Sequence, residues 1–168
     1  HQFKMFLVTG ATGFLGSHLV CHLLQAGHAI KALKRSSSRM DEFDYISSLY
    51  MADNPKLLEQ MQWVVGDVED VFSLEEALEG VSSVFHAAAL VSFHSKDAIR
   101  LIETNQKGTA NLVNTCIHKG IKYFFHISSN ATMGCTPWGE KAEENTEWKL
   151  NKKTTQYSLS KYLAEMEV

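Results

Sequence analysis

The chain has 168 residues, of which 45% are hydrophobic and 21% charged, and its formal net charge is −3 at pH 7. This length suits one domain, and the charge gives no reason to expect a nucleic-acid or anionic-membrane partner. No export signal opens the sequence and no apolar run approaches the ~20 residues of a membrane span, which predicts a cytosolic protein. The cysteines at positions 21, 116 and 135 are too scattered for a disulfide framework.

The first predicted elements are a strand at residues 6–8 and a helix that begins near Phe14, joined by a glycine-rich turn. Gly10 can take the backbone angles of a sharp turn, and Gly13 removes a side chain where the main chain would approach a pyrophosphate. Gly16 lets the helix lie close to the strand. The phosphates of a dinucleotide would then lie against free N–H groups at the start of the helix. Glycine-rich turns also occur for packing reasons alone.

The second predicted strand, residues 29–34, follows a helix stop at Gly27. A site for an unphosphorylated adenosine ribose usually has an acidic residue near the end of this strand. Here Lys34 and Arg35 hold that place, with serines at positions 36–38 beside them. Such cations suit a 2′-phosphate and favour NADP over NAD. A solvated basic loop is the alternative interpretation.

The middle of the chain supplies a third strand and a candidate adenine contact. Residues 41–60 are expected to form a helix and one further turn, broken at Pro55, and they indicate no function. A buried strand is expected at residues 62–67, and Asp67 at its end could accept a hydrogen bond from an adenine amino group. A capping box at residues 73–76 predicts a short structural helix.

Small side chains follow the fourth predicted strand, residues 81–86. Ala87, Ala88 and Ala89 come at its carboxyl end, where ligands bind in open parallel sheets. Their size leaves room for a ribose. A tightly packed crossing from strand to loop would need the same residues.

A long helix at residues 97–118 and a fifth strand at residues 122–128 complete the predicted sheet. Asn105, within the helix, could hold an active-site water, although an amide in this position is often simply packed. Five strands that alternate with helices predict an α/β fold with a doubly wound parallel sheet, the three-layer Rossmann fold. The polar stretch at residues 136–153 is expected to be a loop that borders the substrate.

The last predicted helix, residues 154–168, carries Tyr157 and Lys161 four positions apart and therefore on one face. A free phenol has a pKa near ~10, so a fixed ammonium and a cationic nicotinamide would have to favour the phenolate. Lys161 would do this while it donates to the nicotinamide ribose. Tyr157 would exchange a proton with a substrate oxygen as hydride moves, and Ser129 could hydrogen-bond the same oxygen.

In their order along the chain, these motifs resemble the extended branch of the short-chain dehydrogenase/reductase superfamily, the group of NAD-dependent epimerases and dehydratases. The matching motifs are Thr9-Gly10-x-x-Gly13-x-x-Gly16, Gly66-Asp67-Val68, His86-Ala87-Ala88, Asn105-x-x-Gly108-Thr109, Ser128-Ser129 and Tyr157-x-x-x-Lys161. The residues implied as catalytic are Ser129, Tyr157 and Lys161, with Asn105 in support. The residues expected around the cofactor are Gly10, Thr12, Gly13, Phe14, Leu15, Lys34, Arg35, Asp67, Val68, Ala87, Ala88, Ala89 and Lys161.

The chain departs from the family pattern in two motifs and in length. Residues 130–134 read Asn-Ala-Thr-Met-Gly where the family often has Ala and then Val-Tyr-Gly, which leaves the substrate side open. The basic pair at 34 and 35 is more similar to reductase-like members such as dihydroflavonol reductases. Members of the branch carry a further lobe with most substrate contacts. We therefore expect residues 1–168 to be an incomplete NAD(P)-binding Rossmann domain, the amino-terminal part of a longer protein with little turnover alone.

The expected function is an NAD(P)-dependent oxidoreductase, epimerase or dehydratase that acts on a small molecule, either a sugar nucleotide or a ketone or alcohol. The alternative is a dinucleotide-binding sensor or scaffold that keeps the glycine turn without the chemistry. A homodimer is compatible with the sequence. His18 and His22, beside Cys21, have the spacing of metal ligands, but no third ligand is suggested nearby, so we expect a solvated helix face and no metal.

Overall fold

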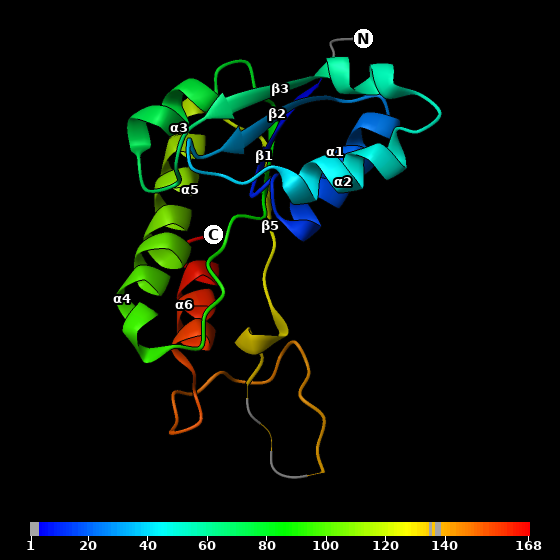
Figure 1. Cartoon of the computed structure of the whole chain (residues 1–168). Coiled ribbons are helices and arrows are strands. Elements are labelled where there is room, and N and C mark those ends of the chain that lie inside the picture. Colours follow the sequence, from blue (N-terminus) through cyan, green and yellow to red (C-terminus); the bar gives the residue numbers. More distant parts are fainter. Residues whose placement is uncertain (1–3, 135, 137–138) are drawn as a thin grey trace.

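The computed structural model describes residues 4–134, 136 and 139–168, so that Cys135 and Pro137 lie outside the described residues. Five parallel strands form one sheet in the order β3-β2-β1-β4-β5 (Figure 1). The strands are β1 Met5–Thr9, β2 Ala29–Lys34, β3 Met61–Val65, β4 Ser83–His86 and β5 Tyr123–His126. The strand order reverses beside β1, so the predicted doubly wound parallel sheet is confirmed.

Helices cover both faces of the sheet, with α1 and α2 on one face and α3, α5 and α6 on the other (Figure 1). The α-helices are α1 Phe14–Gln25, α2 Asp41–Tyr50, α3 Val71–Ala77, α4 Ala98–Leu101, α5 Gly108–Lys119 and α6 Gln156–Glu165. Short 3₁₀ turns lie at η1 Pro55–Gln60, η2 Ser95–Asp97 and η4 Asn130–Thr132. No helix in the described part of the chain is long and apolar enough to cross a membrane.

Alternation along the central strand β1 divides the core between the two faces. Phe6 and Val8 belong to one apolar cluster, with α1 and α2, whereas Leu7 belongs to the other, with α3 and α5. Leu7 and Val8 are fully buried. Successive side chains of a strand point to opposite faces, so a central strand covered by helices on both sides must be apolar throughout.

Two local predictions are wrong, one on the burial of a strand and one on the start of a helix. The strand β3 was expected to be buried, but it is the edge strand of the sheet, and Val65 is 60% exposed. The capping box at residues 73–76 is not formed. The cap of α3 lies three residues earlier, where the Asp70 carboxylate accepts a hydrogen bond from the Phe72 N–H at 3.1 Å. Ser73 instead lies within the first turn and donates to the Asp70 carbonyl.

The single helix expected at residues 97–118 contains a change of helical pitch. After η2 and α4, the segment η3 Ile102–Lys107 is a π-helix, and α5 follows it without a break. A π segment takes more residues per turn than an α-helix, which rotates the side chains that follow it. Here it places Asn105 in the interior, where only 1% of the residue is exposed. The helix ends at Gly120, with φ +68°, near its predicted end.

Candidate functional site

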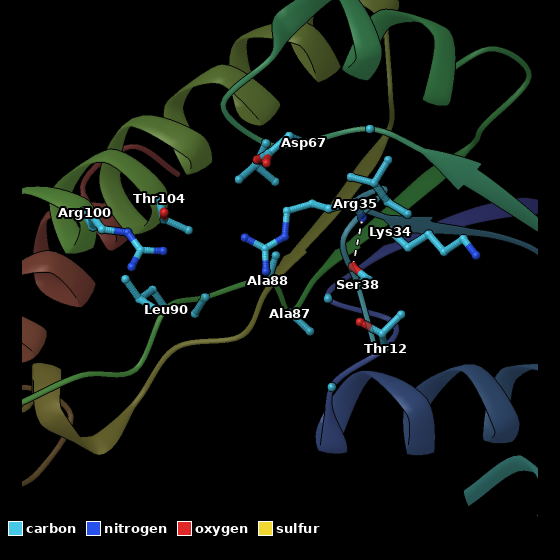
Figure 2. A pocket seen from close by; sticks show the side chains of 16 residues that line it. Thr12, Lys34, Arg35, Ser38, Asp67, Ala87, Ala88, Leu90, Arg100 and Thr104 are labelled. Atoms are coloured by element: carbon cyan, nitrogen blue, oxygen red, sulfur yellow. Dashed lines mark hydrogen bonds between the residues drawn. The ribbon is translucent and has the colours of Figure 1, made fainter. Parts of the chain in front are cut away.

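A cavity of about 260 Å³ opens where β1, β2, β3 and β4 end (Figure 2). It brings together residues that are far apart in sequence and that belong to four different strand-to-helix connections. The predicted cofactor residues that line it are Gly10, Thr12, Gly13, Lys34, Arg35, Asp67, Val68, Ala87, Ala88 and Ala89. The carboxyl edge of a parallel sheet, at the reversal of strand order, is where such folds bind ligands.

The three glycines of the first turn have different reasons to be glycine. Gly10 has φ +67°, and a Cβ there would lie 2.6 Å from the Ala88 nitrogen. A Cβ on Gly16 would overlap the Gly10 carbonyl. Gly13 has an extended backbone, and its Cβ would meet only the Gly10 carbonyl oxygen, at an ordinary 3.5 Å. Neither conformation nor packing within the protein requires glycine at position 13, so the open space beside it fits a group from outside the chain.

The helix α1 begins at this same turn and directs its free N–H groups toward the space. Gly13 is the residue before the helix, and no side chain caps the first turn. The first N–H groups of a helix lack partners within it and attract anions. Phe14 and Leu15 have side chains that are 65% and 52% exposed and that do not line the cavity. Of these two residues, only the backbone is left to contact a ligand.

The two basic side chains at the end of β2, Lys34 and Arg35, point in different directions. Arg35 extends across the cavity, whereas the Lys34 side chain points away from it (Figure 2). The Lys34 ammonium lies 5.3 Å from the centre of the Trp63 ring. The Arg35 N–H donates to Ser38 Oγ, and the Ser38 N–H donates to the Arg35 carbonyl, each at 3.0 Å. This turn holds the Ser38 hydroxyl beside the Arg35 backbone at the cavity wall, and the guanidinium extends from there into the cavity.

Asp67 lies at the edge of the cavity (Figure 2), and its carboxylate is held by the loop that follows β3. Its Oδ1 atom accepts a hydrogen bond from the Glu69 N–H at 3.1 Å. Arg100 and Thr104 form the far wall, and neither is among the residues predicted from the sequence. Their spacing of four residues in the predicted helix, next to Asn105, is the signal that could have found them.

A directed chain of hydrogen bonds fixes the wall behind the cavity. Ala88 N–H donates to Thr9 Oγ1, which lies 2.7 Å from His86 Nδ1. On the other side of the ring, His86 Nε2 lies 2.8 Å from Thr109 Oγ1, and that hydroxyl donates to the Asn105 carbonyl. Because each hydroxyl has one proton, Thr9 donates to Nδ1, and the neutral ring carries its proton on Nε2. Burial is the main reason that the pKa of His86 falls to about 3.

The Asn105 side chain hydrogen-bonds to protein groups, and its role toward an active-site water stays a prediction. Its amide accepts from the Leu90 N–H at 2.7 Å and donates to the Leu90 carbonyl and to Ser160 Oγ, both at 2.9 Å. These contacts use protein groups, because the π segment turns the side chain inward between the 87–93 segment and α6. Asn105 therefore joins the wall of the cofactor-side cavity to the helix that carries Tyr157.

Ser129 and Tyr157 line a second hollow of about 400 Å³, together with Phe93, Met133 and Trp148. The Tyr157 ring meets Phe93 edge-on, with ring centres 5.8 Å apart. Ser129 Oγ accepts a hydrogen bond from the Ala131 N–H at 3.1 Å. The predicted serine and tyrosine are thus brought together. The segment from Ala87 to Phe93 runs from the first cavity to this one.

Lys161 lies one turn beyond Tyr157 on α6 and lines neither of the two hollows. Only 3% of the residue is exposed, and Nζ donates to the Ile127 carbonyl at 2.8 Å, at the end of β5. Burial lowers the pKa of the ammonium, and the nearby charge of Glu165 opposes that shift. An ammonium has three N–H donors, so the bond to Ile127 leaves capacity for another acceptor.

The helix α6 also holds the loop that carries Ser129. The Glu165 carboxylate accepts hydrogen bonds from the hydroxyls of Ser128 and Thr132, the second at 2.9 Å. Ser158 Oγ donates to the Ala131 carbonyl at 2.6 Å. The residues on both sides of Ser129 are therefore fixed to the same helix as Tyr157.

The histidines considered as metal ligands have other partners. His18 and His22 lie 2.9 Å and 3.0 Å from the Tyr50 hydroxyl, so α2 contacts a helix face that was expected to be solvated. Cys21 is buried. His126 is packed beside His86, and neither of its ring nitrogens has a hydrogen-bond partner among the described residues. Burial lowers its pKa to about 4.

Comparison with known proteins agrees with this geometry. The model of the NAD dependent epimerase/dehydratase family matches residues 6–168. The chain belongs to this family. A putative dihydroflavonol 4-reductase of Synechocystis is 36% identical over 162 residues, which are 96% of this chain and 43% of that protein. Sterol demethylase protein B of Methylococcus capsulatus is 32% identical, over 96% of this chain and 45% of its own length.

Solved structures of similar proteins share the fold. UDP-glucose 4-epimerase of Thermus thermophilus, in complex with NAD, is 29% identical with a TM-score of 0.76, over 97% of this chain and 49% of that one. A short-chain dehydrogenase/reductase of Agrobacterium tumefaciens with bound NAD is 25% identical with a TM-score of 0.75, over 98% of this chain and 44% of that one. The chain thus spans less than half the length of these relatives. The chain is a Rossmann domain from a family of enzymes, and its relatives include reductases, dehydrogenases and epimerases.

Proposed function

We propose that the protein is an NADP-dependent oxidoreductase that transfers hydride between the cofactor and a carbonyl or alcohol carbon of a small molecule. The observation that carries this proposal is a pair of hollows that are linked by the segment from Ala87 to Phe93, which follows β4. One contains the glycine turn, and the other contains Ser129 and Tyr157. A bound nicotinamide cofactor would supply or accept the hydride.

The residues of the second hollow would handle the proton. Tyr157 would give its phenolic proton to the substrate oxygen during reduction and take it back during oxidation. Ser129 would donate a hydrogen bond to the same oxygen. Lys161, charged and largely removed from water, would favour the phenolate and so lower the free-energy barrier to proton transfer. Asn105 would act as a positioning residue through Leu90 and Ser160.

NADP is favoured over NAD by the end of β2. Arg35 and the Ser38 hydroxyl provide a cation and a polar group on one cavity wall, where a 2′-phosphate would accept charge-assisted hydrogen bonds. Replacing Arg35 by alanine should weaken NADPH binding more than NADH binding. Arg39→Ala is the matched control, since Arg39 is exposed and pairs with Asp41. An equal loss for both cofactors would contradict the phosphate pocket.

A sugar nucleotide is the second candidate substrate, because the Thermus protein similar to this chain is a UDP-glucose 4-epimerase. Reduction of a ketone and epimerisation of a sugar would use the same Ser129, Tyr157 and Lys161. A sensor or scaffold that binds a dinucleotide without turnover is the alternative function. The cytosolic location and the homodimer stay predictions from the sequence.

The test compares Tyr157→Phe with Tyr45→Phe, whose ring lies exposed on α2. Both variants of the full-length protein are assayed with NADPH and NADH against a panel of ketones and nucleotide sugars. Loss of the general acid should lower turnover at least ~100-fold in the first variant and leave the second unchanged. Activity that survives Tyr157→Phe would show that the relay is wrong. Cofactor binding by the unaltered protein with no turnover on any substrate would favour the sensor.

A further inference from the structure

Arg100 forms part of the cavity wall that faces Arg35 across the dinucleotide site (Figure 2). It lies on α4, and its guanidinium points toward the interior of the cavity. Its ion pair with Asp97 is long, with an N–O distance of 4.0 Å. Asp97 already accepts a hydrogen bond from Ser92 Oγ at 2.7 Å. The N–H donors of Arg100 are therefore available to a ligand.

The backbone that carries Arg100 is held on both sides of the cavity. Thr104, one turn later and on the same wall, donates to Glu69 Oε1 at 2.6 Å and so ties the helix to the loop after β3. Asn105 holds the segment after β4 through two hydrogen bonds to Leu90. With both loops fixed to this helix, the wall keeps its place and only the arginine side chain needs to adjust.

We propose that Arg100 binds the adenine base of the dinucleotide, an inference that rests on the proposed function. The phosphates have places elsewhere, at the Gly13 turn and beside Arg35. The space that is left lies between Arg100 and the loop at Asp67 and Val68. A guanidinium is attracted to the face of an aromatic base and can donate to its ring nitrogens.

The charges around Arg100 favour a neutral base over a phosphate. Asp97 pairs with it, and the Glu69 carboxylate accepts the hydrogen bond of Thr104, one turn from Arg100. These carboxylates lower the local positive potential and would repel a phosphate dianion. Arg100 as a donor and the Asp67 carboxylate as an acceptor would instead match the two kinds of polar group on adenine, its ring nitrogens and its amino group.

The test measures binding of NADPH, NADH and adenosine to full-length Arg100→Ala, with adenosine followed by competition. The affinity should fall by a similar factor for all three ligands, about tenfold, which is the scale of a desolvated cation–π contact. Arg100→Lys keeps the charge without the planar group and should recover only part of the affinity. Arg39→Ala, outside the cavity, should bind like the unaltered protein.

The three ligands distinguish a base contact from a phosphate contact. Unchanged affinity, a loss confined to NADPH, or a loss for both dinucleotides but not for adenosine would each overturn the proposal. Arg100→Gln provides the same comparison if the alanine variant does not fold, and thermal unfolding of each variant checks this. If the unaltered protein binds neither NADPH nor NADH, the proposed function itself fails. If it binds them and Arg100→Ala binds equally well, only the role of Arg100 fails.

Discussion

Replacing Gly16 by alanine should destabilise the protein, whereas replacing Gly13 should weaken cofactor binding and leave stability nearly unchanged. At Gly16 the new methyl group would overlap the Gly10 carbonyl and lie 3.0 Å from Ala11 Cα, and both neighbours are backbone. Gly10 cannot retreat, because its own Cα side already faces the Ala88 nitrogen. The start of α1 would therefore have to move away from the turn.

The magnitudes follow from these contacts. Overpacking of this kind costs about 1–3 kcal/mol, and the higher helix propensity of alanine returns up to about 1 kcal/mol. At Gly13 the methyl group would meet the Gly10 oxygen at 3.5 Å on an extended backbone, so the free energy of unfolding should change by less than about 1 kcal/mol. The same methyl group would enter the space assigned to the pyrophosphate and should weaken NADPH binding at least about tenfold.

The assay is urea unfolding of the two full-length variants without cofactor, followed by titration with NADPH. Gly16→Ala should lower the free energy of unfolding clearly more than Gly13→Ala. Gly13→Ala should lose more NADPH affinity than its small change in stability would explain. Equal destabilisation by the two substitutions, or NADPH binding by Gly13→Ala with unaltered affinity, would refute the assignment of different roles to the two glycines.

Three further predictions concern polar groups near the site. The pKa of His86 is about 3 in the folded state against 6.5 for the free side chain, so the unfolded state binds more protons between these values. The contribution of neutral His86 to the free energy of unfolding is complete above pH 6.5 and falls as the pH drops toward 3. Urea unfolding at a series of pH values should show this decline. The free energy of unfolding of His86→Asn should change less over the same range. Lys161→Met should abolish turnover without loss of thermal stability, because it removes a charge that burial disfavours; a large drop in melting temperature would contradict it. Glu165→Ala should lower kcat at unchanged NADPH affinity by loosening the loop of Ser129, whereas the control Glu167→Ala should leave kcat unaltered.

The fold was predictable where signals are local. The strand at residues 29–34 has the predicted bounds, since a glycine stop precedes it and an apolar run fills it. The exposure of β3 was not predictable from its apolar sequence, because position at the sheet edge depends on the order of all the strands. The cap of α3 was missed because Asp70 and Ser73 are both good capping residues, and only the path of the loop after β3 decides between them.

Local sequence signals also located part of the cavity lining. The glycine turn and the alanines after β4 follow from their place at strand ends, so they line the cavity as expected. Arg100 was missed although it lies four residues before Thr104 in the predicted helix, and the inward position of Asn105 depends on a change of helical phase within a π segment. A regular α-helical pattern cannot locate that change. Lys34 and Arg35 carry the same charge, so the sequence cannot tell which of them faces the cavity. Only the contact of Lys34 with Trp63 shows that Lys34 points away.

The directed hydrogen bonds through His86 connect the walls of the two hollows. The chain of bonds begins at the Ala88 N–H in the wall of the first hollow and ends at the carbonyl of Asn105. The Asn105 amide then continues to Ser160 on α6, one turn from Tyr157. Each threonine hydroxyl in this chain of bonds donates one hydrogen bond. A second proton on the His86 ring would turn Nδ1 into a donor, and the Thr9 hydroxyl would lose its acceptor. Burial lowers the pKa of His86 to about 3, so the ring stays neutral near pH 7 and the hydrogen bonds from the cofactor wall to the tyrosine helix keep their direction.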